Sequence, residues 1–297
     1  MRVAFFGLPL AALLLLRDGH EIPLACVSRP GSVGMRRLVR ALGRGSVLSR
    51  PDVEGEALLA QVRAVRPDLL VSWFWTTRIP PRVLACAPHG GIGVHPSLLP
   101  RHRGPDPYYW AIASGDAETG VTAHALDEQY DTGAILGQMR VPLDPGWNAW
   151  TLARRLDRPS LALLRRVALA FARGEPPAGL PQDERLATAA PAPGDEDVTV
   201  RWAEPSELVA RRVRAASPWP GAITQIGDRP LTLTGVRPTL DYPAALAPGE
   251  ATVRADGVGV VRTADGAVEL LSGQADDDEE PLDARGLASL LGGSGRT

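Results

Sequence analysis

The chain has 297 residues, of which 44% are hydrophobic and 22% are charged, and its formal net charge is −2. This length suffices for one large or two ordinary domains, and we expect two. The near-neutral charge gives no general reason to expect a polyanionic partner. All 32 basic residues are Arg, so the sequence excludes Schiff-base chemistry on a Lys side chain.

The amino-terminal segment MRVAFFGLPLAALLLLRDGHE has an apolar run but no small-x-small cleavage site after it. We interpret it as a buried strand and helix rather than a signal peptide, and we expect a cytoplasmic protein with no membrane partner. The two cysteines, Cys26 and Cys86, lie far apart in apolar surroundings. This placement favours buried thiols over a disulfide or a metal pair.

The first half of the chain alternates short apolar runs with helical patterns. We predict strands at 3–6, 22–27, 68–75 and 90–94, and helices at 10–17, 54–65 and 150–173 with a break near Pro159. Such alternation predicts an α/β, Rossmann-like parallel sheet with helices on both faces, whose ligands collect at the carboxyl ends of the strands. His95 follows one of these strands.

The second half has a different pattern. A connector rich in Pro, Ala, Gly and acidic residues covers 174–197, and we expect it to be extended or loosely packed. After it come a short helix and β-rich segments, at 206–215, 222–226, 231–236, 257–262 and 267–271. These predict a small β-barrel-like (OB-like) domain. We place the domains at 1–190 and 205–297, with 191–204 as linker.

His95 lies in GIGVHPSLLPRHRGPD, where Pro96 and Pro100 stiffen the loop that follows the strand. A rigid loop at a strand end can hold a general acid or an electrostatic catalyst well. The best partner is Asp131 in DEQYDTG, although this segment is also typical of a plain turn. A carboxylate beside the imidazole would keep it a hydrogen-bond donor to a developing oxyanion.

The runs HPSLLPRHRG and GDAETGVTAHALDEQYDTGAIL resemble the folate-dependent formyltransferase family, and the chain is nearest overall to the members that formylate methionyl-tRNA. The segments RVAFFGLP, RPDLLV, PQDERLATAAP and RAASPWPGAI have counterparts there in the same order. The resemblance implies a formyltransferase catalytic domain, transfer of a formyl group from N10-formyltetrahydrofolate to an amine, and no metal.

The resemblance also implies a catalytic triad of Asn, His and Asp. His95 and Asp131 match its His and Asp, whereas Gly93 stands at the Asn position. Losing one side-chain donor to an oxyanion typically costs about 10² to 10³ in turnover. Three interpretations remain open: another donor or a water fills the gap, the acceptor is reactive enough to tolerate it, or the protein no longer transfers formyl groups.

By the same resemblance, the pteridine pocket lies beside the aromatic residues 73–75. The residues that we expect to bind the folate are Trp75, Thr76, Thr77, Arg78, Asp127, Glu128, Gln129 and Tyr130. The residues that we expect to bind the acceptor are Ser97, Arg103 and Asp106. Asp106 lies in RGPDPYYW, which resembles the version in small-molecule formyltransferases, although it also suits a turn before Pro107.

The sequence favours a small-molecule amine as acceptor, either an amino sugar or a biosynthetic amine. It disfavours tRNA, because residues 201–297 hold 10 basic and 14 acidic residues, including the acidic run 276–280. The arginines Arg36, Arg37, Arg40 and Arg44 fit a solvated helix face as well as phosphate contacts. Two alternatives remain: a divergent tRNA-formylating enzyme, and a non-transferring homologue that binds folate or hydrolyses the formyl donor. The oligomeric state is left open.

Overall fold

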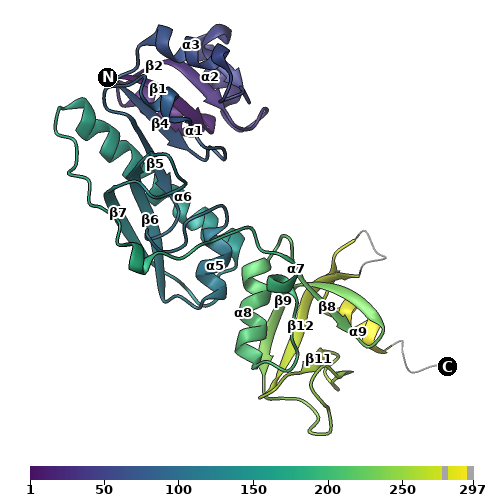
Figure 1. The fold of residues 1–297 in the computed structure, drawn as a ribbon. Helices are drawn as coiled ribbons and strands as arrows, with labels where there is room; N and C mark the ends of the chain where they lie inside the picture. Colours follow the sequence, from purple (N-terminus) through teal and green to yellow (C-terminus); the bar gives the residue numbers. More distant parts are fainter. Residues whose placement is uncertain (276–279, 293–297) are drawn as a thin grey trace. The chain divides into compact units, whose positions relative to one another are not determined.

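A computed structural model describes residues 1–275 and 280–292 (Figure 1). Most of the predicted acidic run therefore lies outside the described residues. The chain forms two compact units that interleave along the sequence. The first unit comprises Met1–Pro107, Glu118–Pro142 and Arg154–Pro191, and the second comprises Tyr108–Ala117, Leu143–Ala153 and Ala192–Thr297.

The first unit is built on a seven-stranded sheet with the order β3-β2-β1-β4-β5-β6-β7. Its strands are β1 (Arg2–Gly7), β2 (Glu21–Val27), β3 (Val47–Ser49), β4 (Leu69–Trp73), β5 (Gly91–His95), β6 (Glu118–Ala125) and β7 (Ile135–Pro142). β1 and β4 are buried almost throughout, as expected for central strands covered on both faces. The Rossmann-like fold predicted from the sequence is confirmed.

One detail of this sheet differs from the prediction, because β6 pairs antiparallel with both β5 and β7. The segment 126–134 that joins β6 to β7 is shorter than the crossover that a parallel pair requires. The chain therefore turns back directly. This antiparallel pairing places residues of β6 opposite β5, close to its carboxyl end, where the predicted site lies.

The helices of the first half are α1 (Pro9–Arg17), α2 (Met35–Leu42), α3 (Glu56–Val65), α4 (Pro81–Leu84), α5 (Pro107–Ala113) and α6 (Ala149–Ala172), with 3₁₀ turns at Arg44–Ser46 and Glu184–Leu186. The sequence predicts a break near Pro159, but α6 runs through it. A proline inside a helix removes one backbone hydrogen bond. Leu156 and Leu163, buried on either side of it, keep the helix continuous by packing. Among the described residues, no helix is long and apolar enough to cross a membrane.

The second unit carries a six-stranded antiparallel sheet with the order β10-β11-β12-β9-β8, and β13 pairs with β12. Its elements are α7 (Asp195–Val198), α8 (Ser206–Ala216), β8 (Ala222–Ile226), β9 (Arg229–Thr239), β10 (Ala251–Val253), β11 (Gly259–Arg262), β12 (Ala267–Ala275), β13 (Leu282–Asp283) and α9 (Ala284–Gly292). Helix α8 buries Val209, Ala210 and Val213 on one face. The predicted β-rich second half is confirmed.

The connector contains the 3₁₀ turn Glu184–Leu186 and the start of α7, and it is firmly hydrogen-bonded to the loop after β5 rather than loosely packed. The Arg103 N–H donates to the carbonyl oxygen of Thr188 at 2.8 Å, and the Ala190 N–H donates to the carbonyl oxygen of Arg103 at 2.6 Å. Gly104 has a φ of +122°, and a Cβ there would lie 2.8 Å from the Ala190 carbonyl oxygen. Only glycine allows the connector to approach so closely.

Candidate active site

His95 ends β5 and is held by the loop that follows it. Its side chain is 7% exposed, and Nε2 lies 2.7 Å from the carbonyl oxygen of His102. Since a carbonyl oxygen only accepts, Nε2 carries a proton and donates it. The other ring nitrogen, Nδ1, faces Asp131, with Oδ2 at 3.4 Å. The structure thus brings together the two residues that the sequence pairs.

Asp131 is fixed from two sides of its loop. Its Oδ2 accepts the backbone N–H of Gly104 at 3.0 Å. The amide of Gln182, on the connector, donates to the carbonyl oxygens of Asp131 and Gly133, each at 2.8 Å. Asp131 itself has a left-handed φ of +59°, a conformation that costs free energy and needs such support. The sequence analysis missed Gln182, whose only signal is its position in the connector motif PQDERLATAAP.

A second imidazole, that of His124 on β6, completes the cluster. Its Nε2 lies 3.6 Å from Asp131 Oδ1, and its Nδ1 lies 2.8 Å from the carbonyl oxygen of Ala125. Burial lowers the pKa of His124 below its ordinary value, while the nearby carboxylate of Asp131 acts in the opposite direction. The sequence analysis missed this residue, although a histidine inside the apolar run GVTAHAL is an available signal.

Gly93 pairs directly with His124 across β5 and β6. A Cβ at position 93 would lie 3.0 Å from Leu126 Cδ2 and 3.6 Å from His124 Nε2. The space beside Gly93 is therefore bordered by the second imidazole. No group of three or more His, Cys, Asp or Glu side chains suited to a metal ion occurs in the part of the chain that the structure describes.

The loops expected to bind the folate meet each other. The Arg78 N–H donates to the Tyr130 hydroxyl at 3.0 Å, and its guanidinium donates to the carbonyl oxygen of Glu128 at 3.1 Å. Thr76 and Thr77, beside it, are exposed. Asp127 closes its own loop by accepting the backbone N–H of Gln129 at 3.1 Å. The candidates therefore lie in two loops joined by hydrogen bonds.

Trp75 lies between these loops and the core. It packs edge-on against Phe6, with ring centroids 5.4 Å apart. Its indole Nε1 is buried and has no hydrogen-bond partner among the described residues. A buried N–H donor without an acceptor is costly, so this atom suits a ligand that brings an acceptor.

Two of the acceptor-binding candidates also hold the loop after β5. Ser97 is fully buried, and its hydroxyl donates to the carbonyl oxygen of Arg101 at 2.6 Å. The guanidinium of Arg103 donates to Gln182 Oε1 at 2.7 Å and to Glu184 at 2.8 Å. Through these hydrogen bonds, the polar atoms of Ser97 and Arg103 hold the loop in its conformation. Asp106, the third candidate, is half-buried, and its N–H donates to Ala190 O at 3.0 Å.

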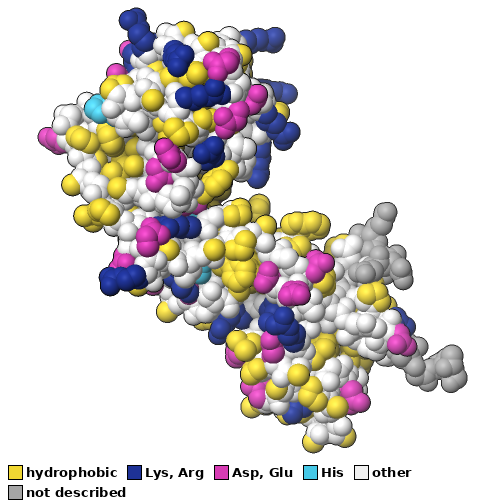
Figure 2. Space-filling view, in the orientation of Figure 1, with side chains coloured by type: hydrophobic (Ala, Val, Ile, Leu, Met, Phe, Trp, Pro, Cys, Tyr) yellow, Lys and Arg dark blue, Asp and Glu magenta, His cyan; other side chains and the backbone are white. Residues whose placement is uncertain are grey.

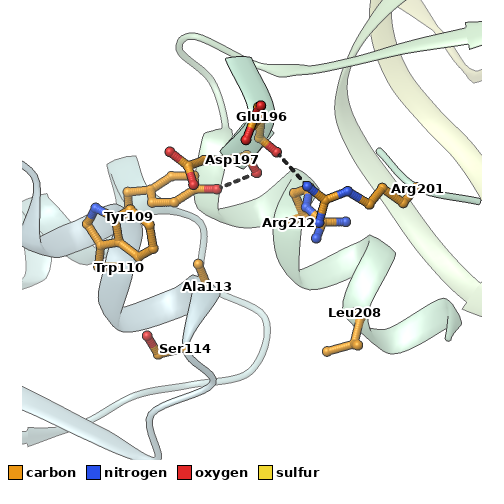
Figure 3. A pocket seen from close by; sticks show the side chains of 9 residues that line it. All are labelled: Tyr109, Trp110, Ala113, Ser114, Glu196, Asp197, Arg201, Leu208 and Arg212. Atoms are coloured by element: carbon orange, nitrogen blue, oxygen red, sulfur yellow. Dashed lines mark hydrogen bonds between the residues drawn. The ribbon is translucent and has the colours of Figure 1, made fainter. Parts of the chain in front are cut away.

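A pocket of about 270 Å³ lies in the second unit (Figure 3). Its lining residues are Tyr109, Trp110, Ala113, Ser114, Glu196, Asp197, Arg201, Leu208 and Arg212. The Tyr109 hydroxyl donates to the carbonyl oxygen of Asp197 at 2.7 Å. Both arginines form ion pairs with Glu204, so their charge is largely neutralised. This pocket offers an anion little attraction.

Helix α2 presents an arginine face, which we define as Arg36, Arg37, Arg40 and the following Arg44. The helix buries only Leu38, and all four arginines are exposed. None of the four forms an ion pair with a residue that the structure describes. Figure 2 shows dark blue arginine side chains along the margin of the first unit beside α2. The charge on this face is therefore available for a partner.

Comparison with known proteins identifies both halves of the chain. The profile of the formyl transferase family matches residues 19–168, and the profile of the formyl transferase C-terminal domain matches residues 194–288. Methionyl-tRNA formyltransferase of Anaeromyxobacter dehalogenans is 38% identical over 91% of this chain and 90% of its own. The protein of the same name from a Roseiflexus species is 34% identical over 92% and 88%.

Solved structures agree on the fold. HypX from Aquifex aeolicus, in complex with tetrahydrofolic acid, has a TM-score of 0.69 at 22% identity, and the chain spans about half of that protein, 47%. An N-formyltransferase from Helicobacter canadensis, in complex with folinic acid and dTDP-3-aminofucose, has a TM-score of 0.68 at 13% identity and is covered over 98% of its length.

Proposed function

The chain belongs to the formyl transferase family of folate-dependent enzymes, and we propose that its acceptor is the amino group of methionyl-tRNA. The observation that carries this proposal is that relatives 34% to 38% identical over most of the chain are named methionyl-tRNA formyltransferase. The donor is N10-formyltetrahydrofolate. We also propose the cytoplasm as the location, because tRNA acceptors are found there.

The small-molecule amine expected from the sequence is therefore wrong, and so is the expectation that tRNA is disfavoured. All eight relatives compared carry the tRNA enzyme's name, whereas the sugar N-formyltransferases are structural neighbours of much lower identity. The physical reason for the error is that the net charge of a domain averages over its whole surface. Binding of a phosphate backbone depends on local clusters of cations.

The arginine face of α2 supports the tRNA acceptor. Four exposed guanidiniums without acidic partners among the described residues can each neutralise a phosphate and release a counterion. Helix α2 follows the loop after β2, and that loop is joined to the loop after β4 by a hydrogen bond of 3.1 Å from Ser28 Oγ to the carbonyl oxygen of Phe74. The cationic face and the candidate active site thus belong to one unit.

The residues present fit the folate donor. The unpartnered Nε1 of Trp75 would gain an acceptor from the ligand, and the joined loops 76–78 and 127–130 would border it. N10-formyltetrahydrofolate supplies the electrophilic formyl carbon. Trp75, with the backbone of these loops, would orient it and exclude water.

His95 and Asp131 provide the electrostatic part of the chemistry. Because His95 Nε2 donates to the carbonyl oxygen of His102, only Nδ1 of this ring is left to take part in the reaction. Asp131 Oδ2 lies 3.4 Å from Nδ1, where its negative charge can support the ring as a hydrogen-bond donor. The pair can therefore stabilise an oxyanion that develops on the formyl oxygen.

The proposed acceptor is tested by incubating the purified chain with N10-formyltetrahydrofolate and methionyl-initiator tRNA, and measuring formylmethionine after the ester is hydrolysed. We expect transfer that weakens steeply as salt rises. A matched reaction replaces the tRNA with free methionine or with an amino sugar nucleotide, and there we expect no transfer. Transfer to the small amines alone would overturn the proposal.

A further inference from the structure

We propose that His124 removes the proton from the attacking amine, a role that rests on the proposed formyl transfer and deepens it. His124 and His95 face opposite oxygens of one carboxylate, Oδ1 and Oδ2 of Asp131, at 3.6 and 3.4 Å. The second imidazole thus belongs to the reacting cluster and is not an isolated core histidine.

The hydrogen bonds of the ring fix which nitrogen can react. Nδ1 lies 2.8 Å from the carbonyl oxygen of Ala125, which only accepts, so Nδ1 keeps a proton. In the neutral ring, Nε2 therefore carries a lone pair. It stands 3.6 Å from Asp131 Oδ1, which exceeds an ordinary hydrogen-bond distance. This arrangement suits a base: once Nε2 takes up a proton, the adjacent carboxylate stabilises the positive charge of the imidazolium.

The surroundings keep this base neutral at rest. Burial lowers the pKa of His124, the carboxylate of Asp131 acts against this, and charge on His95 lowers the pKa further. The titratable groups that face the ring are His95 on β5 and Asp131 and Asp127 in the segment 126–134. With His124 as the proton acceptor and His95 as the hydrogen-bond donor, the two imidazoles have different tasks around one carboxylate.

Gly93 leaves space for the imidazole of His124. The two residues are paired across β5 and β6, and a Cβ on residue 93 would lie 3.0 Å from Leu126 Cδ2 and 3.6 Å from His124 Nε2. Any longer side chain at 93 would compete with the imidazole for the same space. The absence of a side chain at Gly93 therefore leaves the space that the His124 ring needs.

The proton follows a closed path. The amine lone pair forms a bond to the formyl carbon while the C=O electron pair moves to the oxygen, and His124 Nε2 takes the proton of the amine. The C=O bond then re-forms, and the bond from carbon to N10 breaks with its electron pair remaining on N10. His124 returns its proton to N10, so the enzyme ends as it began.

The experiment compares His124→Gln with the wild-type enzyme. Glutamine retains hydrogen-bonding capacity but cannot take up a proton near neutral pH. The matched control is His20→Gln, since His20 is also buried with its pKa lowered by burial but lies before β2, which β1 and β4 separate from β5 in the sheet. Turnover is measured as tetrahydrofolate release, with methionyl-tRNA and with hydroxylamine as a generic amine acceptor.

We expect His124→Gln to lower kcat by about 10²- to 10⁴-fold with both acceptors, while His20→Gln stays near the wild-type rate. In the wild type, kcat should fall as acid protonates His124, and this acidic limb should vanish in His124→Gln. A variant with the wild-type rate, or a slow variant that keeps the limb, overturns the role. If the wild type turns over hydroxylamine but not methionyl-tRNA, the acceptor proposal is refuted. The rates with hydroxylamine then still test the role of His124. No turnover with either refutes both.

A measurement on the wild type alone guards against a variant that fails to fold. In ¹⁵N-labelled enzyme near pH 7, we expect the NMR signals of His124 to show Nδ1 protonated and Nε2 unprotonated. A proton on Nε2 at that pH would overturn the proposal.

Discussion

The cluster at the end of β5 and the arginine face of α2 lie in the same unit but use opposite physical means. His95 and His124 are buried, Asp131 is partly buried, and both imidazoles face the carboxylate of Asp131. The arginines are exposed and act without protein partners among the described residues. Burial strengthens electrostatic interactions and makes every group matter, whereas exposure weakens each one and spreads the effect over several. The rate of catalysis should therefore depend on single residues of the cluster, whereas tRNA affinity should depend on the summed contributions of several arginines.

Among the variants not discussed above, His95→Ala is expected to have the largest effect. Loss of the oxyanion donor should lower kcat by about 10²- to 10³-fold, with little change in tRNA affinity. The matched control is His89→Ala, which removes an exposed histidine of the same unit. Single-turnover rates with methionyl-tRNA provide the measurement. If both variants lower the rate equally, catalysis does not depend more strongly on a buried residue of the cluster than on an exposed histidine.

Gly93→Asn sharpens the comparison inside the cluster. The new side chain must displace Leu126 and crowd His124. We therefore expect kcat to fall by about 10²-fold, which is the loss of rate expected when a catalytic base is moved out of position. Gly93→Ala, which asks Leu126 Cδ2 to move only slightly from 3.0 Å, should cost much less. Rates of both variants, with melting curves to confirm folding, distinguish these outcomes. A faster Gly93→Asn enzyme would show instead that a missing amide limits the reaction.

The arginine face should respond in proportion to the number of charges removed. Each arginine that contacts a phosphate contributes about one unit to the slope of log affinity against log salt. Replacing Arg36, Arg37, Arg40 and Arg44 by Ala, one after another, should flatten that slope stepwise while kcat at saturating tRNA holds. Arg185→Ala, at an arginine already paired with Asp183, is the control. A large change in kcat from one arginine would contradict the contrast with the cluster.

The smallest effect on activity is expected from Ser97→Ala. The change leaves the Arg101 carbonyl oxygen without its 2.6 Å donor, so the free energy of unfolding should fall by about 1 to 3 kcal/mol. Urea unfolding measures the stability, and steady-state kinetics should show an almost unchanged KM for the acceptor. A large rise in KM would instead support Ser97 as an acceptor contact.

The sequence predicts the parts of the fold that depend on local pattern. The buried runs of β1 and β4 and the helical spacing of α3 and α8 are found where their periodicity indicates. His95 and Asp131 could be paired because motifs carry them. The apolar run around His124 indicates a buried histidine, but its place beside Asp131 could not be predicted, since it depends on the antiparallel register of β6 against β5. The availability of the α2 arginines likewise depends on which carboxylates lie nearby in three dimensions.

The contact between the connector and the loop after β5 has a consequence for how the protein can be divided. The oxygen that anchors His95 belongs to His102, whose N–H donates to Thr188 Oγ1 at 2.8 Å. A fragment cut at the end of α6 would keep the whole seven-stranded sheet and still lose this anchor. A fragment that keeps this anchor must therefore extend to Ala190, well beyond the last strand of the sheet.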